Sequence, residues 1–110
     1  MKSPSLLPLL LALLFPMVAI AADTPTFTLV LQNHRYVPNE LRIPAQTRVK
    51  LEIVNKDPTP EEFESVDFPA EKIVMPNSTI SVFVGPLKPG RYGFYGEFHQ
   101  PTAKGTLIVE

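Results

Sequence analysis

The chain has 110 residues, of which 13 are proline, 5 are glycine and none is cysteine or tryptophan, and its 10 basic and 11 acidic residues leave a formal charge of -1. This length allows one small domain, and a near-neutral charge without a basic cluster argues against an electrostatic nucleic-acid surface. Without cysteine the chain cannot form disulfides, thiolate zinc sites, iron–sulfur clusters or the copper–thiolate bond of a blue-copper centre.

The first segment has the three-part pattern of a secretory signal peptide. After a positively charged start, residues 6–20 form an apolar run, and small residues at Ala19 and Ala21 fit cleavage after Ala21 or one residue later. The run is shorter than the ~20 apolar residues of a membrane span, and two prolines interrupt it. A retained N-terminal anchor is the alternative. We therefore expect residues 1–22 to be a cleaved signal peptide and residues 23–110 to form a periplasmic domain without membrane insertion.

The rest of the chain reads as short strands separated by turns. Apolar and polar side chains alternate with a period of two, which places one face of a strand on a core. Proline, asparagine and glycine at the borders are turn formers. About seven or eight strands without helical periodicity predict an all-β fold, a single antiparallel β-sandwich of Greek-key type. The clearest strands are expected at residues 27–32, 48–53, 80–84, 92–94 and 107–109.

Segments spread over nearly the whole of residues 23–110 resemble one known family in their order and spacing. They are Tyr36-Val37-Pro38 before Leu41-Arg42-Ile43-Pro44-Ala45, then Val49 to Asn55, Pro89 to Tyr95, and Lys104 to Val109. In this arrangement the chain resembles the cupredoxins, the β-sandwich fold of small copper proteins. The resemblance implies a cupredoxin-like domain over residues 23–110.

The resemblance also implies where the cupredoxin metal ligands would fall. The cysteine position is Gly96, the histidine position is His99, the methionine position falls near Ala103, and the first histidine position falls at or beside Glu61. One ligand of four is kept, and the ligand that makes copper blue is absent. Ordinary blue-copper electron transfer is therefore not expected.

Two short motifs narrow the resemblance. The block Pro60-Glu61-Glu62-Phe63-Glu64-Ser65 is similar to the Glu-aromatic-Glu segment in cupredoxin-like domains of periplasmic iron-transport proteins. With Gly96-Glu97-Phe98-His99 it looks most like the small stand-alone cupredoxin-like component of a bacterial high-affinity iron-permease operon. This implies a protein that supports iron uptake with an inner-membrane iron permease and other periplasmic iron-transport components. Enzymatic activity stays open: an auxiliary role in Fe(II) oxidation would need a second metal or an electron-accepting partner.

The candidate metal ligands are carboxylates and one imidazole. Glu62 and Glu64 lie two positions apart on an extended segment, about 6.6 Å along the strand, and point to one face. A site of Glu62, Glu64 and His99 favours iron or non-blue copper(II), because carboxylates suit hard ions and imidazole suits intermediate ones. Glu61 and Glu97 complete the candidate set. That His99 lies over the face of Glu62 and Glu64 is implied by the resemblance.

Each candidate ligand has a plainer interpretation. The acidic run can be a solvated strand edge that discourages aggregation, and His99 can be an ordinary loop histidine. His34, which shares a face with Tyr36, is either a second metal ligand or a surface or hydrogen-bonded histidine. Two other functions stay open: a copper carrier or electron-transfer protein, and a metal-free adaptor module that binds a partner through its surface.

Overall fold

The computed structural model describes residues 4, 12–16 and 23–110, so most of the predicted signal peptide and its cleavage site lie outside the described residues. No helix in the described parts of the chain has the length and apolar character of a membrane span. The elements are β1 (Thr26–Gln32), β2 (Arg35–Val37), β3 (Glu40–Ile43), β4 (Val49–Asn55), β5 (Glu61–Ser65), β6 (Ala70–Val74), β7 (Thr79–Val84), β8 (Gly90–Gly96), a 3-10 turn η1 (Glu97–His99) and β9 (Lys104–Val109).

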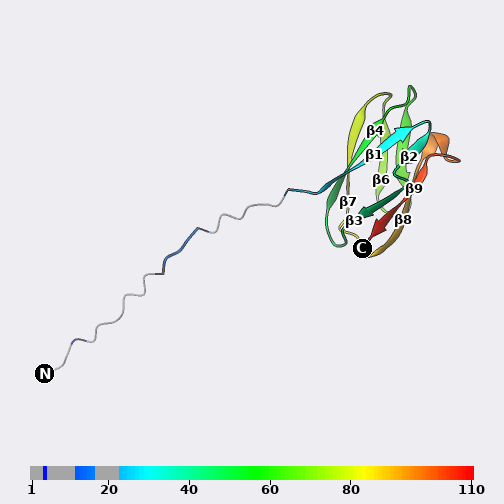
Figure 1. The fold of residues 1–110 in the computed structure, drawn as a ribbon. Coiled ribbons are helices and arrows are strands. Elements are labelled where there is room, and N and C mark those ends of the chain that lie inside the picture. Colours follow the sequence, from blue (N-terminus) through cyan, green and yellow to red (C-terminus); the bar gives the residue numbers. More distant parts are fainter. Residues whose placement is uncertain (1–3, 5–11, 17–22) are drawn as a thin grey trace.

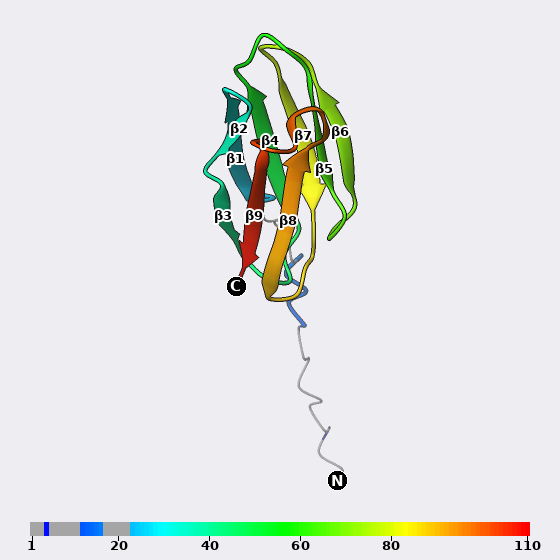
Figure 2. The same ribbon diagram turned by 90° about the vertical axis from the view of Figure 1, so that its right-hand side faces the viewer.

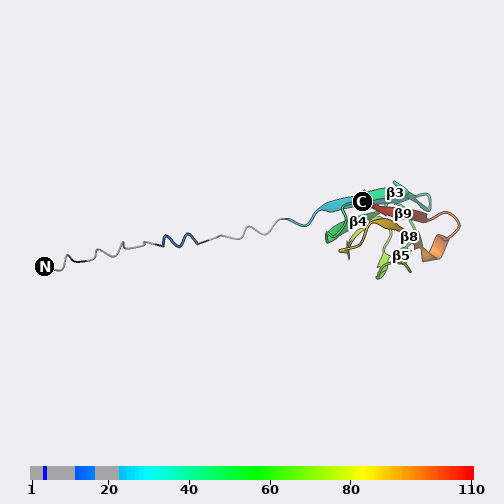
Figure 3. The same cartoon turned by 90° about the horizontal axis from the view of Figure 1, so that it is seen from below.

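The strands form two sheets that pack face to face (Figures 1 and 2). One sheet has the order β2-β1-β4-β7 and the other the order β3-β9-β8-β5-β6; Figure 3 shows β9 between β3 and β8. The all-β sandwich is confirmed. The described residues form nine strands, and β1 pairs with β4 and β3 with β9 in parallel, although the sequence predicted antiparallel strands. After β2 the chain crosses to the other sheet and forms β3. It then returns to the first sheet as β4, which runs in the same direction as β1.

The core lies between the two sheets and follows the predicted alternation. In β4 every second residue from Val49 to Asn55 is buried. An aromatic group of Tyr36, Phe63 and Phe94 joins the sheets, with ring centroids 5.2 to 6.0 Å apart. Fully burying such rings contributes about 1.5–3 kcal/mol each. Phe63 therefore fixes the register of β5, which contains three of the five candidate ligands: Glu61, Glu62 and Glu64.

Three connections meet at one end of the sandwich, the upper end in Figure 2: the β1–β2 turn, the loop before β5, and η1. Asn55, at the end of β4, organises this end. Its buried side-chain amide donates hydrogen bonds to the carbonyl oxygens of Thr59 (2.9 Å) and Met75 (3.2 Å), and its Oδ1 accepts one from the Asp57 amide (2.9 Å). A buried amide with several partners specifies a single loop conformation.

Candidate metal centre

The β1–β2 turn presents His34 in an unusual backbone conformation. Asn33 and His34 have φ angles of 52° and 55°, the left-handed region that two-residue hairpin turns need at both central positions. Asparagine tolerates this region, but the second position favours glycine, and a histidine there is strained. A strained residue persists where the surroundings hold it, and such positions concentrate at functional sites.

Asp57 holds this turn in place. Its carboxylate accepts hydrogen bonds from the amides of Asn33 (2.8 Å) and His34 (2.9 Å), and its side chain is 7% exposed. The same carboxylate lies 3.5 Å from Nδ1 of the His34 ring. The imidazole of His34 is thereby directed by a buried acid at Nδ1, while its Nε2 makes no hydrogen bond within the described residues.

Glu61, the first residue of β5, directs the second imidazole. Its side chain is 1% exposed; Oε1 accepts hydrogen bonds from the amides of Glu62 (3.0 Å) and Phe98 (2.8 Å), and Oε2 lies 2.6 Å from Nδ1 of His99. A ring proton on Nδ1 faces this carboxylate, which leaves the lone pair on Nε2. Glu61 therefore orients His99, and both of its oxygens already have partners.

The two imidazoles lie against each other. The rings of His34 and His99 stack with centroids 3.6 Å apart and an angle of 12° between their planes. Their side chains are 39% and 29% exposed. His99, with Nδ1 hydrogen-bonded to a buried carboxylate, has the arrangement that protein metal sites use to orient an imidazole ligand, and His34 has a buried carboxylate 3.5 Å from its Nδ1. Neither Nε2 makes a hydrogen bond to the residues that the structure describes.

The carboxyl group of Glu61 fills the space beside Gly96, where the resemblance to cupredoxins places the thiolate ligand. A Cβ atom built on Gly96 would lie 2.8 Å from both carboxylate oxygens of Glu61, closer than van der Waals contact. Ala103, at the methionine position, is fully buried. The residues present therefore do not fit a blue-copper centre, and their imidazole and carboxylate groups fit a non-blue ion.

A buried hydroxyl lies below this centre. The Tyr36 side chain packs between Phe63 and Phe94, and its hydroxyl is buried without a hydrogen-bond partner in the part of the chain that the structure describes. Burial raises the pKa of the Tyr36 hydroxyl well above its usual range, and the negative charge of Glu61 raises it further. The phenol is therefore neutral at physiological pH.

The five predicted ligands fall into two groups. Glu61 lies with His99, whereas alternation along β5 turns Glu62 and Glu64 to the other face of the sheet. Contrary to the expectation, His99 lies over the buried oxygens of Glu61 and not over the face of Glu62 and Glu64, because β5 begins at Glu61 and packs Phe63 inward. Glu97 lies within hydrogen-bond reach of Glu64. Metal binding by either group stays a prediction.

The outer group forms an acidic face. One oxygen from each of Glu62, Glu64 and Glu71 lies within 4.8 Å of the others, and Glu64 sits opposite Glu71 on β6 and Tyr95 on β8. Partial burial raises the pKa of Glu64, as do its hydrogen bond to Glu97 and the neighbouring negative charges. Burial and these carboxylates also raise the pKa of Tyr95. The carboxylates on this face carry like charges, so each disfavours the ionised form of its neighbours.

We expect the Glu64→Gln substitution to stabilise the protein at pH 7. A carboxyl whose pKa is higher in the folded than in the unfolded chain loses stability as pH rises through the folded value. The advantage of Glu64→Gln should therefore disappear below the unfolded pKa of about 4. Urea unfolding at several pH values measures the difference from the original protein. Glu40→Gln, which removes a carboxylate ion-paired with Arg91, serves as the control; a Glu64→Gln difference that does not change with pH would contradict the expectation.

The sequence prediction missed part of this centre. Asp57 was not among the candidate ligands or their partners, and His34 was left open between ligand and surface residue. The turn Asn33-His34 at the end of a strand is the signal that could have placed His34, whereas the contact of Asp57 with this turn has no local sequence signal. In a sandwich this turn lies at the same end as the loops after β4 and β8, so its side chain can meet theirs.

Comparisons with known proteins place the fold and the family. The chain is 48% identical over 81 residues to an uncharacterized protein of Rickettsia prowazekii (strain Madrid E), a match that covers 74% of this chain and 65% of that relative. The chain thus spans less than two thirds of the length of that relative.

Solved structures show the same architecture. Auracyanin A, a blue copper protein from Chloroflexus aurantiacus, matches with a TM-score of 0.70 at 14% identity, covering 80% of this chain and 100% of that chain. The metal-binding domain of the Cu(I)-exporting P-type ATPase CopA of Streptococcus pneumoniae, solved with Cu(I), matches with a TM-score of 0.69 at 13% identity, covering 77% and 84%. At these identities the similarity shows the fold. The sequence pattern of the Cupredoxin-like domain family matches residues 5–109, and the chain belongs to that family.

Proposed function

We propose that this protein is a non-blue metal-binding cupredoxin-like protein that holds one divalent ion, copper(II) or iron(II), through Nε2 of His34 and Nε2 of His99. The observation that carries the proposal is the pair of stacked imidazoles, each with Nδ1 beside a buried carboxylate. A carboxylate hydrogen-bonded to Nδ1, as Glu61 is at His99, fixes the tautomer and raises the basicity of a metal-ligating histidine. Glu61 and Asp57 act as orienting groups.

The donor set decides which ions suit the centre. Imidazole nitrogen binds copper, iron and zinc well, whereas thiolate and thioether ligands, which select Cu(I), are missing. Among divalent ions of this series copper(II) binds a given nitrogen site most tightly. Bound copper or iron would supply one-electron chemistry. Two protein ligands also leave coordination positions for exchangeable ligands, which suits loading and release of an ion better than permanent storage.

We also propose a setting for this binding: the periplasm, where the protein would pass iron as cargo to an inner-membrane iron permease. The signal-like segment at residues 1–22 and the Glu-Phe-Glu motif of β5 support this setting. In the source organism, deleting the gene should lower uptake of radioactive iron at limiting concentrations, and restoring the original chain should recover it. Uptake unchanged by the deletion would contradict the iron role while leaving the metal site intact.

Metal titration tests the site itself. We expect calorimetry to show one Cu(II) ion bound per chain in the micromolar range or tighter, with weaker binding of Fe(II) under anaerobic conditions. The substitutions His34→Gly and His99→Ala should each weaken Cu(II) binding at least about tenfold, the size of one lost ligand or orienting contact, and together should abolish it. Glycine suits the left-handed conformation of residue 34, so His34→Gly removes the imidazole without unfolding the turn.

A matched control separates the two faces of β5. The double substitution Glu62→Gln/Glu64→Gln removes two carboxylates from the acidic face and should leave Cu(II) affinity unchanged. Loss of binding in this variant, with binding retained in His34→Gly/His99→Ala, would move the site to the acidic face and contradict the proposal. Absence of binding by Cu(II), Fe(II) and Zn(II) in the original protein would instead favour the metal-free adaptor.

A further inference from the structure

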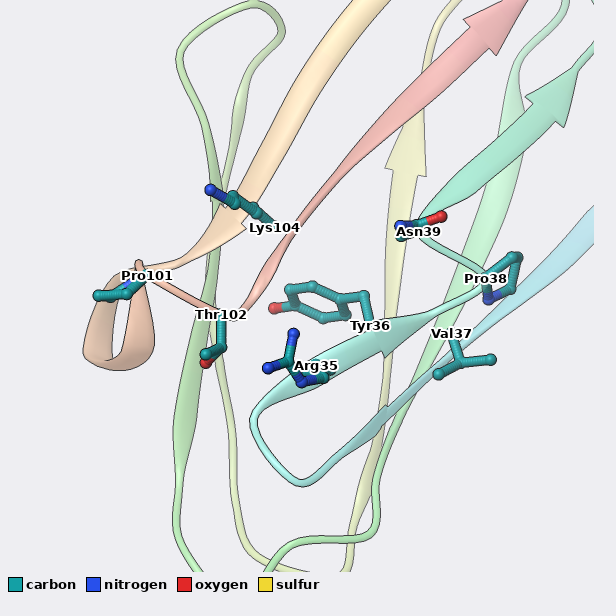
Figure 4. Close-up of a pocket in the computed structure, with 8 residues that line it drawn as sticks. All are labelled: Arg35, Tyr36, Val37, Pro38, Asn39, Pro101, Thr102 and Lys104. Atoms are coloured by element: carbon teal, nitrogen blue, oxygen red, sulfur yellow. The ribbon is translucent and has the colours of Figure 1, made fainter.

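A cavity lies beside the metal centre, on the side of the edge strand β2. It has a volume of about 420 Å³ and is bounded by β2, by the residues that lead into β3, and by the loop between η1 and β9 (Figure 4). Its walls include Val37, Pro38 and Pro101, which are apolar. This volume falls in the range of sites for small molecules.

Two cationic side chains line the cavity, and none of its described lining residues is acidic, although the charge of Glu61 reaches the Tyr36 hydroxyl. Arg35 extends from β2 and Lys104 from the first residue of β9. In the part of the chain that the structure describes, neither of them forms an ion pair, although Arg42, Lys50 and Arg91 do. Two unpaired cations on one concave surface favour a ligand with more than one negative charge.

The hydroxyl of Tyr36 provides a second, independent observation. Tyr36 is 2% exposed, its hydroxyl has no hydrogen-bond partner in the described residues, and it lines the cavity. In Figure 4 the hydroxyl end of the ring points toward Arg35 and Thr102. Buried hydroxyl groups in proteins almost always have a partner. The missing partner here would be a ligand oxygen.

We propose that this cavity binds a small organic polycarboxylate, with its carboxylates at Arg35 and Lys104 and one oxygen accepting a hydrogen bond from Tyr36. The guanidinium group offers a carboxylate two parallel donors, and the ammonium group adds a compact charge. The apolar walls suit a carbon skeleton, which inorganic phosphate lacks. Arg35 is exposed and unpaired, so its side chain can move to admit a ligand oxygen to the buried hydroxyl.

The cavity shares its two loops with the metal centre but uses different residues. Arg35 and Tyr36 follow His34 directly, and the loop that carries Pro101 and Thr102 follows His99. The polycarboxylate site therefore does not depend on metal binding. A carboxylate ligand held beside the imidazoles would also be placed to occupy the coordination positions that two histidines leave open.

Calorimetric titration of the metal-free protein with citrate tests the proposal. We expect measurable 1:1 binding that weakens as salt is added, since screening reduces ion pairing. Arg35→Gln/Lys104→Gln should lower citrate affinity at least about tenfold, the usual effect of losing charge-assisted hydrogen bonds, and Tyr36→Phe should lower it about fivefold. Arg42→Gln/Lys50→Gln, which removes the same net charge from two strands outside the cavity, should leave it unchanged.

Further measurements distinguish a polycarboxylate site from a phosphate site, from nonspecific charge attraction and from the metal site. Binding of inorganic phosphate as tight as that of citrate would overturn the choice of a polycarboxylate, and so would citrate binding that Arg42→Gln/Lys50→Gln weakens as much as Arg35→Gln/Lys104→Gln. No citrate binding at millimolar concentrations would also overturn it. The variant His34→Gly/His99→Ala should keep citrate binding while losing Cu(II), so that the two proposals succeed or fail separately.

Discussion

Substituting histidine for Glu61 together with cysteine for Gly96 is expected to turn the protein blue when copper(II) is added. The two changes remove the carboxylate that fills the space beside Gly96, the cysteine position that the resemblance implies, and supply a cysteine and a second histidine beside His99. Copper bound by one thiolate and two imidazoles is the blue-copper ligand set, in which the axial ligand is weak and variable. Ala103 at the axial position should therefore not prevent it. The visible spectrum after Cu(II) addition measures the intense copper–thiolate absorption.

The single substitution Gly96→Cys is the control. A side chain at residue 96 would meet the Glu61 carboxylate, with its Cβ 2.8 Å from both oxygens, so overpacking should cost about 1–3 kcal/mol of the free energy of unfolding. The copper–thiolate absorption should be absent or weak in this variant. If the double variant folds and binds copper(II) but stays colourless, Glu61 and Gly96 do not hold the positions that the geometry assigns to them.

Asn55→Ala is expected to be the most destabilising single change at the loop end of the sandwich. It leaves the buried amide of Asp57 without its partner and removes the part-buried hydrogen bonds to the carbonyl oxygens of Thr59 and Met75. Losing these hydrogen bonds together, one of them to a buried amide, should lower the free energy of unfolding by about 3 kcal/mol. For a domain of this size, the thermal midpoint should fall by roughly 15 °C.

Circular dichroism during heating measures this loss. Gln32→Ala, at an exposed position of β1, should change the midpoint by no more than a few degrees. A stable Asn55→Ala variant would show that the loop before β5 holds its conformation without the amide. Because Asp57 follows two residues later and holds the turn of His34, Cu(II) affinity should fall in the same variant at temperatures where it remains folded.

Much of the fold can be predicted from the sequence, because a half-buried strand has alternating apolar and polar residues. The strands from Val49 and from Ile80 were predicted for this reason, and burial in β4 follows the pattern residue by residue. The parallel pairing of β1 with β4 could not be predicted. Pairing direction depends on where the chain crosses between sheets, and short turns of similar composition do not specify that.

The site was harder to predict than the fold, because a shift of one residue along β5 changes which glutamate is buried. In a strand, a shift of one residue moves each side chain to the opposite face. The run Glu61-Glu62-Phe63-Glu64 allows either face to be acidic, and the inward packing of Phe63 decides that Glu61 is the buried member. The role of His34 depends on a left-handed turn held by Asp57. Such a contact between distant segments leaves no local pattern in the sequence.

The position of β9 has a consequence for how the molecule is made. β9 follows the other described strands in sequence, yet it lies between β3 and β8 and is the neighbour of both. β3 therefore has no strand partner until β9 is present, because Glu40 pairs with Thr106. Sheets built from such distant pairings fold in about milliseconds to seconds, more slowly than helical domains. A nascent chain thus stays incompletely folded until β9 is synthesised, and a chain that stops before Lys104 leaves β3 without a partner and one edge of β8 open, although β8 still pairs with β5.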